Sequence, residues 1–293
     1  MNQLIYGEDN ILANNLLGTA ASVNSIELSQ LKTYYQNNLV PNLTKLHVVG
    51  AVSKEQIISS IATLAAQWHQ QEIVKPVAAA VTAQTKPQIY FYDVPGAKQS
   101  QLKIGYAALN ASDKDHYGAQ VMNYILGGGS FASQLTQQLR ESKGYTYGIS
   151  SDFYATDLSG QFIISSGVRS NVTFEAIELI KQVVTRYQQD FSQHDLATTK
   201  SYYLKSNARR FETLAAKLTM LHNMSHYNLA ADYVLARADL VNSLDLDALK
   251  GIAQQYLTPN KFIYLVVGDA KTQLERLNQL GLGEPILLNP AKK

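Results

Sequence analysis

The sequence predicts an α+β protein, with a mixed, largely antiparallel sheet and helices packed on one face of that sheet. Two observations support this prediction. Strand-like segments come first in the central part of the chain, a run of helices follows, and one strand returns near the end. In addition, residues 25–50 and 243–268 align without a gap and share eleven identical positions, which indicates a duplicated domain.

The duplication sets the predicted domain organisation. The two copies read SIELSQLKTYYQNNLVPNLTKLHVVG and SLDLDALKGIAQQYLTPNKFIYLVVG, and only 24 residues precede the first of them. We therefore expect residues 1–70 to be the C-terminal remainder of a first domain. Residues 71–87 are rich in Ala, Thr and Gln and predict a linker, and residues 88–293 predict a complete second domain.

The first-domain remainder predicts a helix, a strand and a second helix. Apolar residues from Leu28 to Leu39 recur at helical spacing, and Pro41 ends that helix. Leu46–Val49 is a short apolar run that predicts a buried strand. Ser53 begins the next helix with the spacing of a capping box. The strand would belong to a sheet whose other strands are mostly absent from this chain.

The complete domain predicts the remaining strands and helices in order. Two strands come first, a helix to about residue 126 ends at a glycine run, and a short helix closes at Gly144. Two alternating segments around a turn then predict a hairpin, and a long helix with several shorter ones follows. The predicted strands are 88–94, 100–109, 145–154, 161–168 and the end of the second repeat copy.

Composition excludes several classes of function. With no cysteine, the chain has neither a disulfide nor a thiolate metal site. A net charge of +2 with scattered Lys and Arg gives no basic stripe, so we expect no nucleic-acid partner. No run of about 18 apolar residues occurs, so we expect no membrane span.

Two local patterns have a chemical and a structural interpretation. His222 and His226 lie four residues apart, a spacing that places zinc ligands on one helix face, but Ser225 stands where an inverted zinc motif needs glutamate. We therefore predict no metal site there. The glycine-rich turn Gly127, Gly128 and Gly129 lacks the Gly-Lys-Ser/Thr of a phosphate loop, so a helix end with a tight turn and positive φ is favoured.

One segment carries a family resemblance. Residues 126–148, LGGGSFASQLTQQLRESKGYTYG, contain a glycine-rich turn, Leu139-Arg140 at the end of a short helix, Gly144 and Tyr147. This run resembles the pitrilysin family, which includes insulin-degrading enzyme and mitochondrial processing peptidase. The end of the second repeat copy, with Tyr256, Pro259-Asn260 and then VVGD at 266–269, is similar to the end of the domains of that family.

The resemblance implies a function and a set of missing parts. Family members close two homologous α+β domains like a clamshell on a peptide, and the first domain holds zinc through H-x-x-E-H and a downstream glutamate. This sequence lacks that motif. The chain is therefore expected to be the substrate-binding half of a zinc metallo-endopeptidase, without a complete catalytic set or a cofactor of its own and inactive alone. Zinc is expected in the missing part of the first domain.

The resemblance also assigns two site residues and several partners. Arg140 and Tyr147 match the Arg and Tyr that reach across the chamber to substrate, so a transition-state role is implied for them. The expected partners are a peptide or unfolded polypeptide and a zinc-bearing homologous domain or subunit. A bacterial periplasmic or secreted location is expected from the resemblance alone. The alternative is a non-catalytic scaffold relative, which keeps the fold without the chemistry.

Overall fold

The protein is described by a computed structural model that covers residues 1–73, 79–81, 84–206 and 209–288. Clustering of contacts divides the chain into two compact units. Unit 1 is formed by Met1–Ala13, Ala80–Lys205 and Val234–Lys293, and unit 2 by Asn14–Ala79 and Ser206–Tyr233. Part of the predicted linker, at 74–78 and 82–83, lies outside the described residues. The predicted boundaries at 1–70, 71–87 and 88–293 remain a prediction, because compactness does not reveal where a duplication began.

Unit 1 contains the six-stranded sheet formed by the described residues, in the order β3-β4-β2-β5-β1-β6. The neighbours β3, β4, β2 and β5 run antiparallel, whereas β1 lies parallel to both β5 and β6. This confirms the predicted fold class and the predicted hairpin. The strands are β1 Gln88–Asp93, β2 Gln99–Ala108, β3 Thr146–Ala155, β4 Gly160–Arg169, β5 Ile263–Gly268 and β6 Ile286–Leu288.

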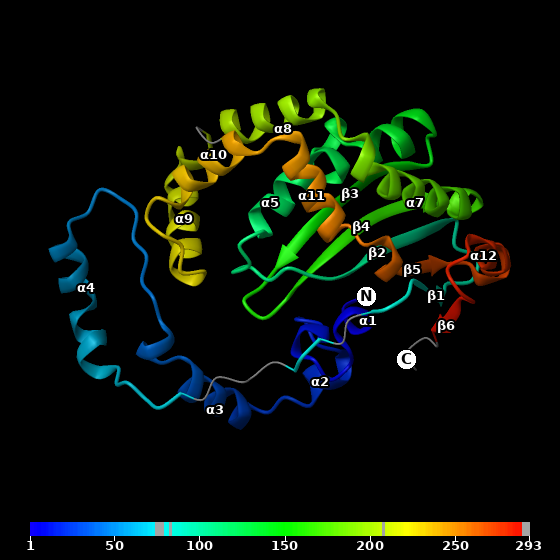
Figure 1. The fold of residues 1–293 in the computed structure, drawn as a ribbon. Coiled ribbons are helices and arrows are strands. Elements are labelled where there is room, and N and C mark those ends of the chain that lie inside the picture. The colour runs from blue at the N-terminus through cyan, green and yellow to red at the C-terminus, as the bar shows by residue number, and fades with distance from the viewer. Residues whose placement is uncertain (74–78, 82–83, 207–208, 289–293) are drawn as a thin grey trace. The chain divides into compact units, whose positions relative to one another are not determined.

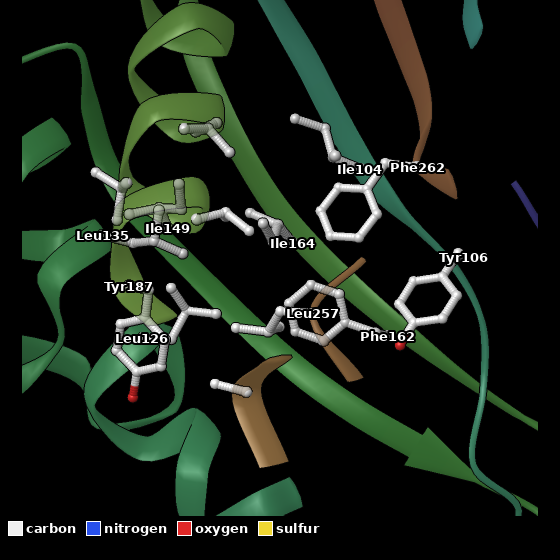
Figure 2. Packing of buried hydrophobic residues seen from close by; sticks show 14 of the residues in the cluster. Ile104, Tyr106, Leu126, Leu135, Ile149, Phe162, Ile164, Tyr187, Leu257 and Phe262 are labelled. Carbon is white, nitrogen blue, oxygen red and sulfur yellow. The ribbon is translucent and has the colours of Figure 1, made fainter. Parts of the chain in front are cut away.

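Helices cover one face of this sheet and enclose the main core (Figure 1). In β4, Phe162 and Ile164 belong to that core, whereas Ile163 between them faces the opposite side. Figure 2 shows Tyr106, Phe162 and Phe262 packed together at one end of the core and Leu135 near Tyr187 at the other. The helices of the unit are α1 Asn2–Tyr6, α5 His116–Asn123, α6 Gln134–Thr136, α7 Thr173–Asp190, α8 Gln193–Ser206, α10 Tyr233–Ser243, α11 Leu246–Tyr256 and α12 Ala270–Leu277.

The opposite face of the sheet has a small second core. Ile5 and Tyr6, the last two residues of α1, are buried against Ile163 of β4 and Ile263 of β5. Burial raises the pKa of the Tyr6 hydroxyl to about 12. The first residues of the chain therefore belong physically to unit 1, although they precede the first repeat copy in the sequence.

Unit 2 is helical and has little core of its own. Its helices are α2 Ala20–Asn24, α3 Leu28–Asn38, α4 Lys54–Gln67 and α9 Leu214–His226, and none of them contains a buried residue. Ser53 caps α4 with the predicted capping box. The Trp68 indole N–H donates to the Leu39 carbonyl at 2.9 Å. Because α3 contains no buried residue, its apolar side chains, such as Leu28 and Leu31, are exposed to solvent.

The strand predicted at Leu46–Val49 is absent, and this prediction is wrong for the described chain. The run is apolar and follows a 3-10 turn at Pro41–Leu43, as the second copy follows Pro259–Lys261. In the second copy the equivalent residues form β5, because β1 and β2 flank them and supply the hydrogen bonds. No described strand pairs with residues 46–49, so no ladder forms there.

Candidate functional site

Arg140 lies on the short helical segment that precedes β3. The segment begins at α6, where the Ser133 hydroxyl accepts a hydrogen bond from the Thr136 N–H, and continues as a π-helical turn at Gln137–Ser142. Leu135 and Leu139 are fully buried and fix the segment to the core. The turn ends at Gly144, whose φ of 60° explains why glycine stands there. These bounds confirm the predicted short helix closing at Gly144.

The Arg140 guanidinium is held from two sides and is still accessible. Its Nε lies 3.3 Å from the Glu141 carboxylate, and its Cζ lies 4.8 Å from the centre of the Phe131 ring. The Arg140 side chain is 40% exposed, so the ion pair contributes little, on the order of 0–1 kcal/mol. The contacts orient the guanidinium and leave several of its N–H groups available for a ligand.

Tyr147 lies in a β-bulge at the start of β3. Thr146 pairs with Val168 of β4, but the next described pair is Ile149 with Ser166, so β3 has one residue more than its partner. A bulge re-aims the side chains within it. Tyr147 is 89% exposed, so its side chain faces solvent and is not packed into the core.

Buried hydroxyl groups fix the bulge. The Thr146 hydroxyl accepts from the Gly148 N–H at 3.0 Å and donates to the Gly167 carbonyl at 2.7 Å. The Ser166 hydroxyl lies 3.0 Å from the Thr146 hydroxyl and 3.1 Å from the Gly148 carbonyl. Sequence reasoning missed Thr146 and Ser166 as positioning residues, since only the strand register reveals the bulge.

Arg140 and Tyr147 line the same hollow, which has a volume of about 450 Å³. We call it the Arg140–Tyr147 hollow; its walls are Gln99, residues 140–141 and 144–147, Gly167 and Arg169. The sequence-predicted pair is therefore brought to one surface of unit 1. Hydrogen-bond donors of this kind suit a carbonyl oxygen or an oxygen on which negative charge develops.

The glycine-rich turn closes the helical segment as predicted, in the π-helical turn Tyr124–Gly128 that follows α5, but for a different reason. None of Gly127, Gly128 and Gly129 has a positive φ; the residue that does is Ser130, at 50°. Small size is what the site requires, because a Cβ on Gly127 would stand 2.2 Å from the Ser151 hydroxyl oxygen and 2.6 Å from the Ser151 nitrogen. On Gly129 it would stand 2.7 Å from the Tyr124 carbonyl oxygen. The positive-φ explanation is wrong, and close approach of backbones replaces it.

This turn connects the helix layer with the edge strand β3 and with Arg140. The Asn123 amide donates to the Ser151 carbonyl at 2.6 Å, and the Ser151 hydroxyl donates back to the Asn123 side chain. The Arg140 guanidinium packs on the ring of Phe131, which follows the turn. The Phe131 carbonyl accepts a hydrogen bond from the Gln137 side-chain amide at 2.6 Å. The glycine run therefore supports the wall on which Arg140 lies.

Zinc does not fit the described residues of this chain. The rings of His222 and His226 are stacked in parallel, with centroids 5.5 Å apart, and His47 meets the His222 ring edge-on at 6.2 Å. The His47 Nε2 is engaged with the Ser225 hydroxyl at 2.8 Å. Within the described ranges, no group of three His, Cys, Asp or Glu side chains is placed to hold a metal ion. No helix in those ranges has the length and apolar character needed to cross a membrane.

Comparison with known proteins gives a family match and several similar relatives. Residues 25–203 match the family model described as the peptidase M16 inactive domain. Over 271 residues the chain is 23% identical to the "uncharacterized zinc protease YmxG" of Bacillus subtilis, covering 91% of this chain and 64% of that protein. It is 22% identical to the "non-peptidase homolog YmxG" of Helicobacter pylori, covering 89% of this chain and 60% of that protein.

Solved structures show the same fold. A peptidase M16 inactive domain from Pseudomonas fluorescens is similar with a TM-score of 0.83 and 23% identity, covering 92% of this chain and 64% of that chain. A chain of complex III2 from Candida albicans is similar with a TM-score of 0.72 and 13% identity, covering 92% of this chain and 66% of that chain. The chain spans somewhat less than two thirds of the length of these curated relatives. With more than half of its residues matched by the family model, this chain belongs to the peptidase M16 inactive-domain family.

Proposed function

We propose that this chain is the substrate-binding half of a zinc metallo-endopeptidase and contributes one wall of a chamber that holds peptides. The observation that supports this proposal is the placement of Arg140 and Tyr147 on one hollow, with Arg140 oriented by Phe131 and Tyr147 turned outward by a bulge.

The two side chains are suited to the same substrate atom. The Arg140 guanidinium is a permanent cation with five N–H donors, and the Tyr147 hydroxyl supplies a further donor. Both stabilise negative charge on a peptide carbonyl oxygen, and that charge grows as the carbonyl carbon is attacked. Their contribution is therefore larger in the transition state than in the bound substrate.

In this proposal the zinc and its ligands come from a homologous domain or subunit outside this chain, and zinc supplies a metal-activated water there. The described residues hold no set of ligands that could replace it. The chain alone is then expected to bind peptide without cleaving it. The partner is a peptide or an unfolded polypeptide, which meets Arg140 and Tyr147 from the open side of their hollow.

A non-catalytic scaffold is the second candidate, and the names of relatives favour it. One Helicobacter pylori relative is called a non-peptidase homolog, and a Bacillus subtilis relative that is 29% identical over 187 residues is called a probable inactive metalloprotease. An H-x-x-E-H motif directly upstream of this sequence or in a neighbouring gene would support the peptidase. Absence of the motif from both places would favour the scaffold.

The test compares peptide binding and peptide cleavage in matched variants. Arg140→Ala and Tyr147→Phe should each lower turnover about ten- to a thousand-fold when the zinc-bearing half is supplied. The double variant should lose less than the product of the two losses, because both residues address one atom. Tyr154→Phe is the control, since Tyr154 is another exposed tyrosine of β3 and lies outside the hollow. Unchanged turnover in both single variants, with unchanged melting temperature, would favour the scaffold.

A further inference from the structure

We propose that Arg169 makes the Arg140–Tyr147 hollow selective for a carboxylate of the peptide, carried by an acidic side chain or by the C-terminus. The proposal deepens the proposed function and rests on it, because it assumes that a peptide occupies this hollow. Arg169 belongs neither to the sequence motif nor to the pair that the motif predicts.

Strand geometry brings Arg169 to the hollow. Arg169 is the last residue of β4 and stands directly opposite Gln99 at the start of β2. Its neighbour Val168 is buried in the main core, so alternation along the strand places Arg169 on the other face. Both Arg169 and Gln99 are exposed and line the hollow.

Backbone contacts join Arg169 to the turn that carries Arg140. One guanidinium nitrogen of Arg169 donates to the Gly144 carbonyl at 3.3 Å, and the Gly144 N–H donates to the Arg140 carbonyl at 3.0 Å. The Arg169 N–H donates to the Tyr145 carbonyl at 3.4 Å. Arg140 lies at the start of this turn, and Arg169 of β4 contacts the end of the turn at Gly144 and Tyr145. The two arginines therefore border the same hollow.

The charges around the hollow do not cancel. Its charged lining residues are Arg140, Glu141 and Arg169, and the Glu141 carboxylate is already paired with Arg140. Arg169 has no carboxylate within ion-pair distance among the residues that the structure describes. The Arg169 guanidinium has further N–H donors besides the one that bonds the Gly144 carbonyl. Two parallel N–H donors of a guanidinium match the two oxygens of a carboxylate. Gln99 and Tyr147 add neutral donors beside it.

A purely structural role for Arg169 is the competing interpretation, in which it only holds the Gly144 turn. The two roles are separable because glutamine at this position keeps an N–H for the Gly144 carbonyl and loses the charge. Lysine keeps the charge and loses the fork. A holding role would change the melting temperature and affect all peptides alike, whereas a selective role changes the ratio between an acidic peptide and a neutral one.

The experiment measures binding of three synthetic dodecapeptides to the whole chain. They consist of Gly, Ser, Ala and Tyr and carry an uncharged fluorophore. The first has a central Glu and an amidated C-terminus, the second a central Gln and an amidated C-terminus, and the third a central Gln and a free C-terminus. Wild type should bind at least one of the two carboxylate peptides about five- to thirty-fold more tightly than the neutral one. The preferred peptide identifies the carboxylate source.

The variants decide between the outcomes. Arg169→Gln should abolish the preference, Arg169→Lys should retain most of it, and high salt should weaken it. Arg186→Gln removes an exposed arginine that lines a separate hollow and should leave the preference unchanged. Equal affinity of wild type for all three peptides would overturn the Arg169 proposal and leave the proposed function intact, because the hollow still binds a peptide. If no peptide binds to wild type, the proposed function fails and this proposal fails with it.

Discussion

Replacing Gly127 by alanine tests the close packing of the glycine-rich turn on the edge strand. Gly127 is buried, and its φ lies outside the left-handed region, so alanine would not strain the backbone at this position itself. The added methyl group would instead stand 2.2 Å from the Ser151 hydroxyl oxygen, 2.6 Å from the Ser151 nitrogen and 2.8 Å from its Cβ. Real Cβ contacts essentially never fall below 3.0 Å, so β3 or the turn must move.

The expected loss of stability follows from which atoms must move. The hydroxyl oxygen of Ser151 can rotate away only by losing its hydrogen bond to Asn123, and the Ser151 nitrogen belongs to a strand paired with β4 and moves only with the backbone. Overpacking of this kind costs about 1–3 kcal/mol. The shift would also disturb the hydrogen bonds between Asn123 and Ser151. We expect a net loss of about 2 kcal/mol, which lowers the melting temperature by about 4–8 °C.

The control substitution is Gly251→Ala in α11. Gly251 is exposed in the middle of a helix, and a Cβ there meets no atom within 4 Å. Alanine should therefore stabilise the helix by about 0.5–1 kcal/mol, since it restricts the unfolded chain and favours helix.

The assay is thermal and urea unfolding of wild type, Gly127→Ala, Gly251→Ala and the double variant Gly127→Ala/Ser151→Ala. The double variant removes the nearest contact but leaves the Ser151 nitrogen and Cβ in place, and it also removes the hydrogen bond to Asn123, so it should not regain the stability of wild type. A Gly127→Ala protein as stable as wild type, beside a stabilised Gly251→Ala protein, would refute the close approach described here.

Three further predictions follow from the same structure. Thr146→Val removes the hydroxyl that bonds Gly148, so unfolding experiments should show a loss of about 1–3 kcal/mol. In the folded protein, burial lowers the pKa of His116 from its usual 6.5, although a hydrogen bond to the Phe153 backbone opposes this shift. As the pH falls, the unfolded chain therefore takes up a proton before the folded protein does. The free energy of unfolding should then decrease as the pH drops below about 6.5. Urea titrations at pH 5.5 and 7.5 should show a smaller difference for His116→Gln than for wild type. Hydrogen exchange should be faster in α3 and α4 than in β2 and β4, because neither helix contains a buried residue.

The sequence was sufficient to predict the elements that depend on local pattern. The helix of the first repeat copy, Leu28–Asn38, corresponds residue by residue to Leu246–Tyr256 in the second. Capping residues, apolar spacing and the proline that follows are local features, and both copies have them. The glycine-rich turn was also placed correctly, but the contact between Gly127 and Ser151 joins segments far apart in the chain.

The candidate site was predictable only in part, for a related reason. A family resemblance selects Arg140 and Tyr147, and a short turn between them is enough to place both on one surface. Nothing local shows that Tyr147 lies in a bulge, since the bulge exists only in the register of β3 against β4. The same holds for Arg169, which reaches the hollow through the pairing of β4 with β2.

The two repeat copies show most directly where local information ends. LHVVG and YLVVG are nearly the same apolar segment, and both follow a helix and a 3-10 turn of equal length. One copy forms β5, flanked by β1 and β2, and the other has no regular structure in a unit whose described residues form no strand. A strand satisfies its N–H and C=O groups through its neighbours, whereas a helix satisfies them within itself. The sequence of such a segment therefore shows only that it can pair as a strand. Whether a strand forms depends on whether other strands lie beside it.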